Sequence, residues 1–148
     1  IVSSTKHLLP KKDNRTIQAD IKIDDTILHV FSIHFKHSHQ KQLDLQDQQA
    51  ETLISLLPKE RTVVMGDCNA LPESTVIQKM NQVLYNTDPN VTTPTWSVYR
   101  NGCTKCLIGD VVHKLDYIFT TRDIQTKAFA VHNSKASDHL PVSTTIEI

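Results

Sequence analysis

The chain has 148 residues, of which 39% are hydrophobic and 22% are charged, proportions typical of a folded globular domain rather than a disordered segment. Sixteen Lys and Arg residues balance sixteen Asp and Glu residues, which argues against a polybasic protein held to nucleic acid mainly by counterion release. No apolar run approaches the roughly 20 residues that span a bilayer. The length fits about one domain, so residues 1–148 are predicted to form a single unit.

The predicted elements begin with two strands. Apolar and polar residues alternate over residues 17–23, which is the period of a half-buried strand. Asp24 and Asp25 form a polar break, and residues 26–35 are predicted to form a second strand paired antiparallel to the first. This second strand is apolar on both faces, which places it near the centre of a sheet.

A helix is predicted over residues 38–57, with Ser38 as its N-cap and Pro58 ending it. Its Gln, Asp and Lys residues are expected on the side opposite the apolar stripe. That stripe consists of Leu43, Ala50, Leu53, Ile54 and Leu57.

The rest of the chain combines short strands with one more helix. A short apolar strand over residues 62–65 ends at the polar group Gly66–Asn69, and Ser74 is expected to cap the next helix. Residues 86–110 are irregular, and strands are expected over residues 114–120, 126–131 and 140–148. The predicted fold class is α/β (α+β), with mixed or antiparallel strands rather than a regular βαβ alternation.

Four predicted strands or loops carry polar residues at their ends. Each residue alone has an ordinary explanation, because an Asp after a strand often caps a turn and a His in an apolar strand often packs in a core. Together they supply oxygen ligands for Mg²⁺ or Mn²⁺, a base for water and donors for phosphate, which metal-assisted hydrolysis of a phosphate ester requires. These residues are His34, Asp67, Asn69, Asp116, Asp138 and His139.

The residues of these motifs and their order along the chain resemble the C-terminal half of the endonuclease/exonuclease/phosphatase superfamily, which has the deoxyribonuclease I-like fold. The shared pattern is a strand ending in His, a helix with a Gln-rich face, Gly-Asp-x-Asn, Asp-Tyr-Ile-Phe and Ser-Asp-His-x-Pro-Val. In this chain the pattern runs from roughly Arg15 to the C-terminus. The matching stretches are His34, residues 40–57, Gly66–Asn69, Asp116–Phe119 and Ser137–Val142.

The resemblance implies a role for each matching residue. Asp67 would orient or deprotonate the attacking water and Asn69 would bind a phosphate oxygen. His139 would contact the scissile phosphate, with Asp116 accepting its other ring N–H, and His34 would donate to the phosphate or assist the leaving group. Asp138 and Asp67 are the expected ligands of Mg²⁺ or Mn²⁺.

One departure from the family pattern is large. The early Asn and the metal-binding Glu of the superfamily's N-terminal half have no matching motif, and residues 1–14 are too few to hold the strands that carry them. The chain, which begins with Ile1, is therefore expected to be the C-terminal part of a longer enzyme, inactive alone. Its fold is expected to be half of a two-sheet β-sandwich flanked by helices. The sheet face left by the missing half is expected to expose an apolar patch or to self-associate.

The remaining candidates have competing interpretations. Cys68, between Asp67 and Asn69, is expected to be a small buried hydrophobe with a raised pKa. Cys103 and Cys106 are compatible with a zinc site, a disulfide or two free thiols. Trp96 is a candidate substrate contact, although packing of its loop explains it as well. The His37 and His39 pair is expected at a solvated helix entrance, with a phosphate contact as the minor interpretation.

The leading function is divalent-metal-dependent hydrolysis of a phosphate ester by in-line attack of water. The substrate is left open between nucleic acid, phospholipid and inositol phosphate. The alternative is a non-catalytic interaction module that retains half of the fold, and a small zinc-stabilised domain is a third interpretation. The first residues have no signal-peptide pattern, so a cytoplasmic location is only the default expectation.

Overall fold

The computed structural model describes residues 1–10, 15–37, 44–88, 90, 93–97 and 111–148. The elements in this part of the chain are β1 (Ser3–Leu8), β2 (Arg15–Ile23), β3 (Thr26–His34), α1 (Asp44–Leu56), β4 (Thr62–Asp67), α2 (Thr75–Val83), β5 (Tyr85–Asn86), β6 (Trp96–Ser97), β7 (Val111–His113), β8 (Asp116–Thr120), β9 (Gln125–Val131) and β10 (Val142–Glu147).

The main sheet has six strands in the order β1-β2-β3-β4-β8-β5. All neighbouring pairs are antiparallel except β3 and β4, which run parallel. The connection between β3 and β4 contains α1, because parallel neighbours need a crossover. The predicted hairpin is confirmed, and its turn places Asp24 at φ 52°, a conformation that Asp tolerates better than most residues.

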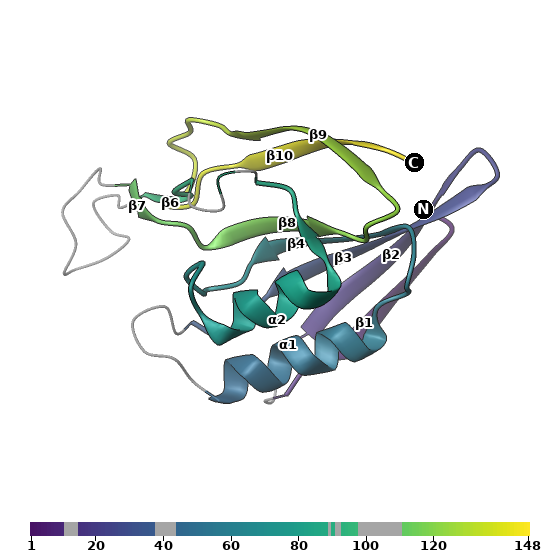
Figure 1. The fold of residues 1–148 in the computed structure, drawn as a ribbon, viewed down its shortest axis with the longest axis horizontal. Helices are drawn as coiled ribbons and strands as arrows, with labels where there is room; N and C mark the ends of the chain where they lie inside the picture. The colour runs from purple at the N-terminus through teal and green to yellow at the C-terminus, as the bar shows by residue number, and fades with distance from the viewer. Residues whose placement is uncertain (11–14, 38–43, 89, 91–92, 98–110) are drawn as a thin grey trace.

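The sheet separates two layers that differ in kind (Figure 1). Helices α1 and α2 cover one face, and the antiparallel pair β9–β10 lies over the other. The prediction of an α/β fold with mixed strands flanked by helices is confirmed. None of the helices in the described ranges is long and apolar enough to cross a membrane.

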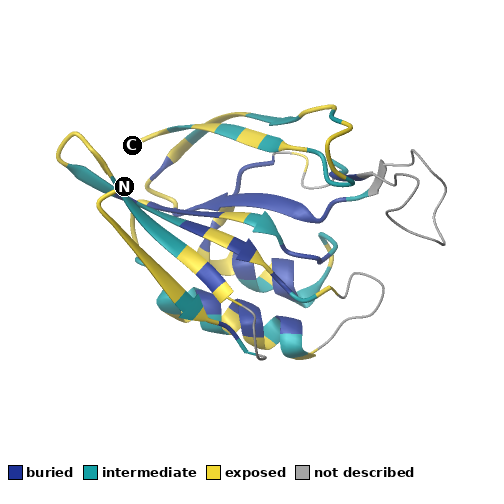
Figure 2. Cartoon of the chain, turned by 180° about the vertical axis from the view of Figure 1, so that it is seen from behind, coloured by how far each residue is buried: buried dark blue, intermediate teal, exposed yellow. Residues whose placement is uncertain are grey.

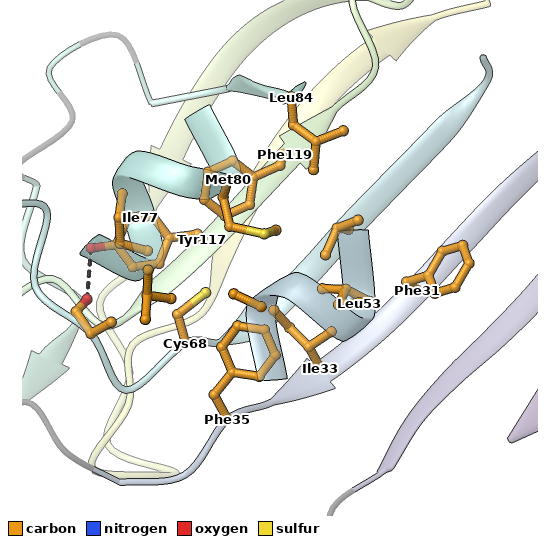
Figure 3. Packing of buried hydrophobic residues seen from close by; sticks show 14 of the residues in the cluster. Phe31, Ile33, Phe35, Leu53, Cys68, Ile77, Met80, Leu84, Tyr117 and Phe119 are labelled. Carbon is orange, nitrogen blue, oxygen red and sulfur yellow. Dashed lines mark hydrogen bonds between the residues drawn. The ribbon is translucent and has the colours of Figure 1, made fainter. Parts of the chain in front are cut away.

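Two clusters of buried side chains hold these layers together. The larger one joins the helices to the sheet and includes Phe31, Leu53, Ile77 and Phe119 (Figure 3). The smaller one, between the sheet and the β9–β10 pair, is formed by Leu28, Val63, Ile118 and Ile124. Burial of both faces of β8 and of the first half of β4 explains why these strands are almost continuously apolar in sequence.

Several elements differ from the sequence predictions. The edge strand β1 was not predicted, since its residues are mostly exposed and show no apolar alternation (Figure 2). The strand predicted from Lys114 starts at Asp116, after the separate short strand β7. Helix α1 begins at Asp44, and the proposed cap Ser38 lies outside the described residues.

The predicted polar side of α1 is wrong for two residues. Gln46 and Gln49 are 2% and 0% exposed, so they lie in the interior rather than in solvent. Their amides bond to backbone groups: Gln49 donates to the carbonyl of Pro10 and accepts from the N–H of Lys36. A long amide satisfies buried backbone groups that an apolar stripe cannot, so periodicity alone misassigns it.

Candidate active site

Gly66 allows two neighbouring strands to end side by side. In the parallel pair of β3 and β4, Ile33 lies beside Gly66 and His34 beside Asp67. The backbone of Gly66 has φ 139°, and a Cβ there would lie 2.1 Å from the carbonyl oxygen of Ile33. Because no side chain fits at that distance, glycine is required for His34 and Asp67 to reach the same edge of the sheet.

Asp116 reaches the site from the other side of β4. It is the first residue of β8, pairs with Asp67 across the antiparallel ladder and is 9% exposed. Its Oδ2 lies 2.8 Å from Nδ1 of His139. A carboxylate only accepts, so Nδ1 of His139 carries the proton and its Nε2 is the nitrogen that remains for other partners.

The charge of His139 is stabilised by the carboxylates around it. The hydrogen bond to Asp116 raises the pKa of His139, burial acts in the opposite direction, and the charges of Asp116, Asp67 and Asp138 raise it further. The Nε2 atom of His139 is 3.9 Å from Oδ2 of Asp67. His139 is therefore suited to act as an imidazolium donor.

Asp67 is the central carboxylate of the site. Its Oδ1 accepts the backbone N–H of Asn69 at 2.6 Å, and its Oδ2 accepts the Asn69 side-chain amide at 2.8 Å. Nε2 of His34 lies 3.5 Å from the same Oδ2. Burial raises the pKa of Asp67, the Asn69 backbone bond opposes this shift, and the charge of Asp116 adds to it. A raised pKa makes Asp67 a better base for water.

Asn69 orients Asp67 from a backbone position in the left-handed region, which Asn adopts more readily than most residues. Its φ is 48° and it is 3% exposed. The side-chain amide nitrogen donates to Asp67 and, at 3.1 Å, to the carbonyl oxygen of Phe35. Its Oδ1 lies 3.1 Å from Nδ1 of His37. The direct phosphate contact expected of Asn69 stays a prediction, since both amide hydrogens serve protein acceptors here.

Trp96 connects the loop before β7 to the segment around His139. Its Nε1 donates to Oδ2 of Asp138 at 3.4 Å, and its backbone forms a bridge with His139. The indole is 6% exposed and stacks on His113 with 5.9 Å between ring centroids. Both interpretations of Trp96 therefore have support, because it packs the loop and also lines the pocket described next.

The site residues surround one open pocket of about 230 Å³. The structure brings together every predicted site residue, and Asp116 contacts the pocket through His139. The residues lining it are His34, His37, Asp67, Asn69, Trp96, Leu115, Asp138 and His139.

Sequence reasoning missed Thr95, which organises Asp116. The Thr95 hydroxyl donates to Oδ2 of Asp116 at 2.7 Å and accepts the backbone N–H groups of Leu115 and Asp116, both at 3.0 Å. Its carbonyl accepts the N–H of Leu140. A threonine in an irregular loop carries no sequence signal of such a role.

Gln46 is the second missed residue. Its side-chain nitrogen lies within 2.9 Å of the backbone carbonyls of Lys36, Cys68 and Asn69. One helix side chain thus ties the segment after β3 to the segment after β4. The Gln-rich helix of the family pattern was the available signal.

Cys68 is a buried hydrophobe, as predicted. It is 0% exposed, and burial, followed by the charges of Asp67 and Asp116, raises its pKa well above the usual thiol value. Its side chain points into the core between the sheet and the helices (Figure 3). Cys103 and Cys106 lie outside the described residues.

Known proteins can now be compared with this geometry. A sequence profile of the endonuclease/exonuclease/phosphatase family matches residues 1–139. The chain belongs to this family. The match includes the edge strand β1, so it extends further toward the N-terminus than the motifs alone. No curated protein matches the chain in sequence.

Solved structures share the fold of this endonuclease/exonuclease/phosphatase family chain at low sequence identity. A Bacteroides vulgatus family member is 18% identical over 100% of this chain and 66% of its own, with a TM-score of 0.72. TDP2 from D. rerio, complexed with a single-strand DNA product, is 14% identical over 99% of this chain and 68% of its own, with a TM-score of 0.72. Sphingomyelinase C from Streptomyces griseocarneus is 13% identical over 97% and 63%, with a TM-score of 0.61. The chain thus spans 66% and 63% of the two bacterial structures.

The side chains of this family member fit a hard divalent cation. Asp67, Asp116 and His139 each offer a ligand atom within 4.8 Å of one another. Asp116 and His139 use their facing atoms on each other, whereas Asp67 and Asp138 both present carboxylates to the pocket. One or two carboxylates plus substrate oxygens are the usual protein-side ligands of Mg²⁺. The carboxylate oxygens of this group are therefore of the kind that a hard divalent cation takes as ligands.

Proposed function

We propose that the chain carries the catalytic pocket of a divalent-metal-dependent phosphoric-ester hydrolase. The observation that supports this most directly is the pair of hydrogen-bonded dyads, Asp116–His139 and Asn69–Asp67, facing one pocket. A base for water and a cationic donor for phosphate lie within a few ångströms, as general acid–base hydrolysis requires.

Each residue has a step that its geometry favours. Asp67, held by Asn69 and with a raised pKa, accepts a proton from the attacking water. His139, protonated at Nδ1 toward Asp116, donates from Nε2 to a phosphate oxygen. The exposed His34 donates to the phosphate or to the leaving group. Asp67 and Asp138 would hold a divalent ion, which would neutralise part of the phosphate charge.

The proposed substrate is a phosphate ester, and the described residues do not select one class of phosphate ester over another. One similar structure is a complex with a single-strand DNA product and another is a sphingomyelinase, so nucleic acid and phospholipid both belong in the first assays, together with inositol phosphates.

We also propose that residues 1–148 act as the C-terminal part of a longer enzyme, because no glutamate lines the described pocket. An intact mass well above 16.8 kDa in native cells supports this, and a mass near that value contradicts it.

The test of the activity uses the gene product as native cells make it. We expect hydrolysis of bis(p-nitrophenyl) phosphate or p-nitrophenyl phosphate with Mg²⁺ or Mn²⁺, and none with EDTA. His139→Ala should lower turnover by a factor on the order of 10² to 10⁴, as for other general acids. The matched control is His132→Ala, an exposed histidine bonded to Ser143 away from the pocket. Full activity of His139→Ala contradicts the mechanism.

A further inference from the structure

A buried ion pair near the candidate active site has no part in the proposed mechanism. Nζ of Lys114 is 2.8 Å from Oδ2 of Asp88, and the two side chains are 1% and 0% exposed. The Lys114 ammonium lies 4.8 Å from the ring centroid of Tyr117 and 4.9 Å from that of Phe129. Burial acts to raise the pKa of Asp88, but the hydrogen bond from Lys114 and its charge outweigh burial and lower the pKa. The pair is therefore charged, and because burying two charges is costly, it is weak evidence for stability alone.

Asp88 organises the segment that leads to Thr95. Its Oδ1 accepts the backbone N–H of Asn90 at 3.0 Å, and its Oδ2 accepts that of Thr93 at 3.2 Å. The Thr93 hydroxyl also donates to Oδ1, at 3.3 Å. Pro94, whose ring fixes its φ angle, joins Thr93 to Thr95. These bonds define the Asp88 turn (Asp88, Asn90 and Thr93), and an apolar residue in place of Asp88 would leave its two N–H groups without this acceptor.

The segments joined by the ion pair meet a second time at Thr95. Lys114 directly precedes Leu115 and Asp116, whose backbone N–H groups both donate to the Thr95 hydroxyl at 3.0 Å. That hydroxyl donates to Oδ2 of Asp116 at 2.7 Å, and the Thr95 N–H donates to the carbonyl of His113. The ion pair and these hydrogen bonds therefore fasten the same two parts of the chain to each other.

We infer that Asp88 and Lys114 are positioning residues of the candidate active site. The ion pair holds the Asp88 turn against the start of β8, and this contact keeps the Thr95 hydroxyl on Asp116, the carboxylate to which His139 donates. The catalytic part of this inference rests on the proposed function, whereas the placement of Thr95 is a property of the fold that can be measured without a substrate.

The first test measures amide hydrogen exchange by NMR in the 148-residue chain and in the double variant Asp88→Asn with Lys114→Met. Asn keeps an oxygen for the turn and Met keeps an unbranched side chain, so the variant removes the link between the segments rather than the turn itself. The reporters are the N–H groups of Leu115, Asp116 and Leu140, all bonded to Thr95. We expect them to exchange about tenfold faster or more relative to the amides of β3, as the loss of buried hydrogen bonds produces.

The second test measures turnover by the gene product on the phosphate ester that the parent hydrolyses. The double variant should lower kcat by a factor on the order of 10 to 10² and leave KM within about twofold, because a misplaced group that acts in the transition state changes the rate and not the binding. Met80→Ala is the matched control for stability. It truncates a fully buried side chain of α2, so it should lower the urea midpoint but leave kcat and the relative exchange of the reporter amides unchanged.

Thr93→Val is a milder variant that keeps both charges. It replaces the hydroxyl that donates to Asp88 with a methyl group, and the reporter amides should exchange about two- to threefold faster, as the loss of one weak hydrogen bond produces. If the double variant does not fold, this variant decides the question, and reporter amides that exchange as in the parent overturn the inference.

The outcomes separate this inference from the proposed function. A double variant with the relative exchange and the kcat of the parent overturns the inference and leaves the proposed function standing, since the pair then only stabilises the fold. Faster exchange with unchanged kcat also overturns it, because catalysis then does not depend on the placement of Thr95. If the parent hydrolyses no phosphate ester, the proposed function fails and the catalytic part of the inference fails with it, while the exchange rates still decide whether the pair places Thr95.

Discussion

Asp116 determines the protonation of His139, although it lies behind that residue and not on the pocket wall. Its carboxylate accepts two hydrogen bonds, from the Thr95 hydroxyl and from Nδ1–H of His139, and its backbone N–H donates to the same Thr95 hydroxyl. At the scale of single residues, neighbouring groups fix the charge and the tautomer of the site's side chains before any substrate binds. Such preorganisation is what electrostatic catalysis requires.

Replacing Asp116 by Asn should lower the pKa of His139. The hydrogen bond to Asp116 is the largest cause of the raised pKa of His139, and the negative charge of Asp116 raises it further. The His139 titration midpoint, followed by NMR, should therefore fall in Asp116→Asn, and turnover of the gene product should fall with it.

The raised pKa of His139 also determines how the stability of the fold depends on pH. Because folding raises the pKa of His139, the pair stabilises the fold at pH values below the ordinary histidine pKa, and this contribution disappears as the pH rises through the folded value. The difference in unfolding free energy between the parent and Asp116→Asn should narrow from pH 5 to pH 9. An unchanged His139 midpoint in the variant contradicts the assignment.

Thr95→Val should destabilise the chain by about 2 kcal/mol, since it leaves two buried backbone N–H groups without their acceptor. Valine keeps the shape of threonine and replaces its hydroxyl with a methyl group. The matched control Thr95→Ser keeps the hydroxyl and should restore most of the stability in urea unfolding. Equal losses in both variants would show that the methyl group, not the hydroxyl, matters.

At the scale of the elements, strand ends position the residues proposed to be catalytic. The parallel pair of β3 and β4 places His34 beside Asp67, and the antiparallel pair of β4 and β8 places Asp116 on the other side. Gly66 makes this arrangement possible, because a side chain at its position would collide with the Ile33 carbonyl oxygen. Helix α1 supports the same edge from below through Gln46.

Gly66→Ala should destabilise the fold by more than about 3 kcal/mol, because the new Cβ meets the Ile33 carbonyl at 2.1 Å and the backbone has positive φ. Urea unfolding measures the loss. Met65→Ala is the neighbouring control, and as a partly exposed position it should cost less than about 1.5 kcal/mol. A Gly66→Ala chain as stable as Met65→Ala would refute the close approach.

The sequence predicts the residues that line the site better than it predicts the residues that hold them in place. The catalytic candidates are found because polar residues interrupt apolar strands at the ends of β3 and β4, a local pattern. Thr95 and Gln46 act through backbone groups far away in the sequence, such as the Cys68 carbonyl 22 residues from Gln46. Composition and periodicity contain no information about such partners. The edge strand β1 escapes prediction for the same reason, since its partner β2 determines its pairing.

The two faces of the main sheet are covered unequally at the scale of the whole molecule. Ile17, Ser32 and Met65 occupy one row across β2, β3 and β4. The next strand in that row contributes Ile118, which is buried under the β9–β10 side. Ile17 and Met65 are 46% and 41% exposed. Exposed apolar side chains therefore lie on this face beyond the part that β9 and β10 cover, with the exposed Ser32 between Ile17 and Met65.

We predict that the 148-residue chain self-associates through this uncovered face, because exposed apolar surface continuous with a core is buried when a partner is available. Sedimentation at increasing concentration should give a mass that rises above the 16.8 kDa monomer. The double variant Ile17→Lys with Met65→Lys should remain monomeric. Its matched control, Val83→Lys with Tyr85→Lys, replaces two similarly exposed apolar side chains of α2 and β5 and should associate like the parent. A parent chain that stays monomeric contradicts the prediction, whereas association of both double variants moves the contact to another surface.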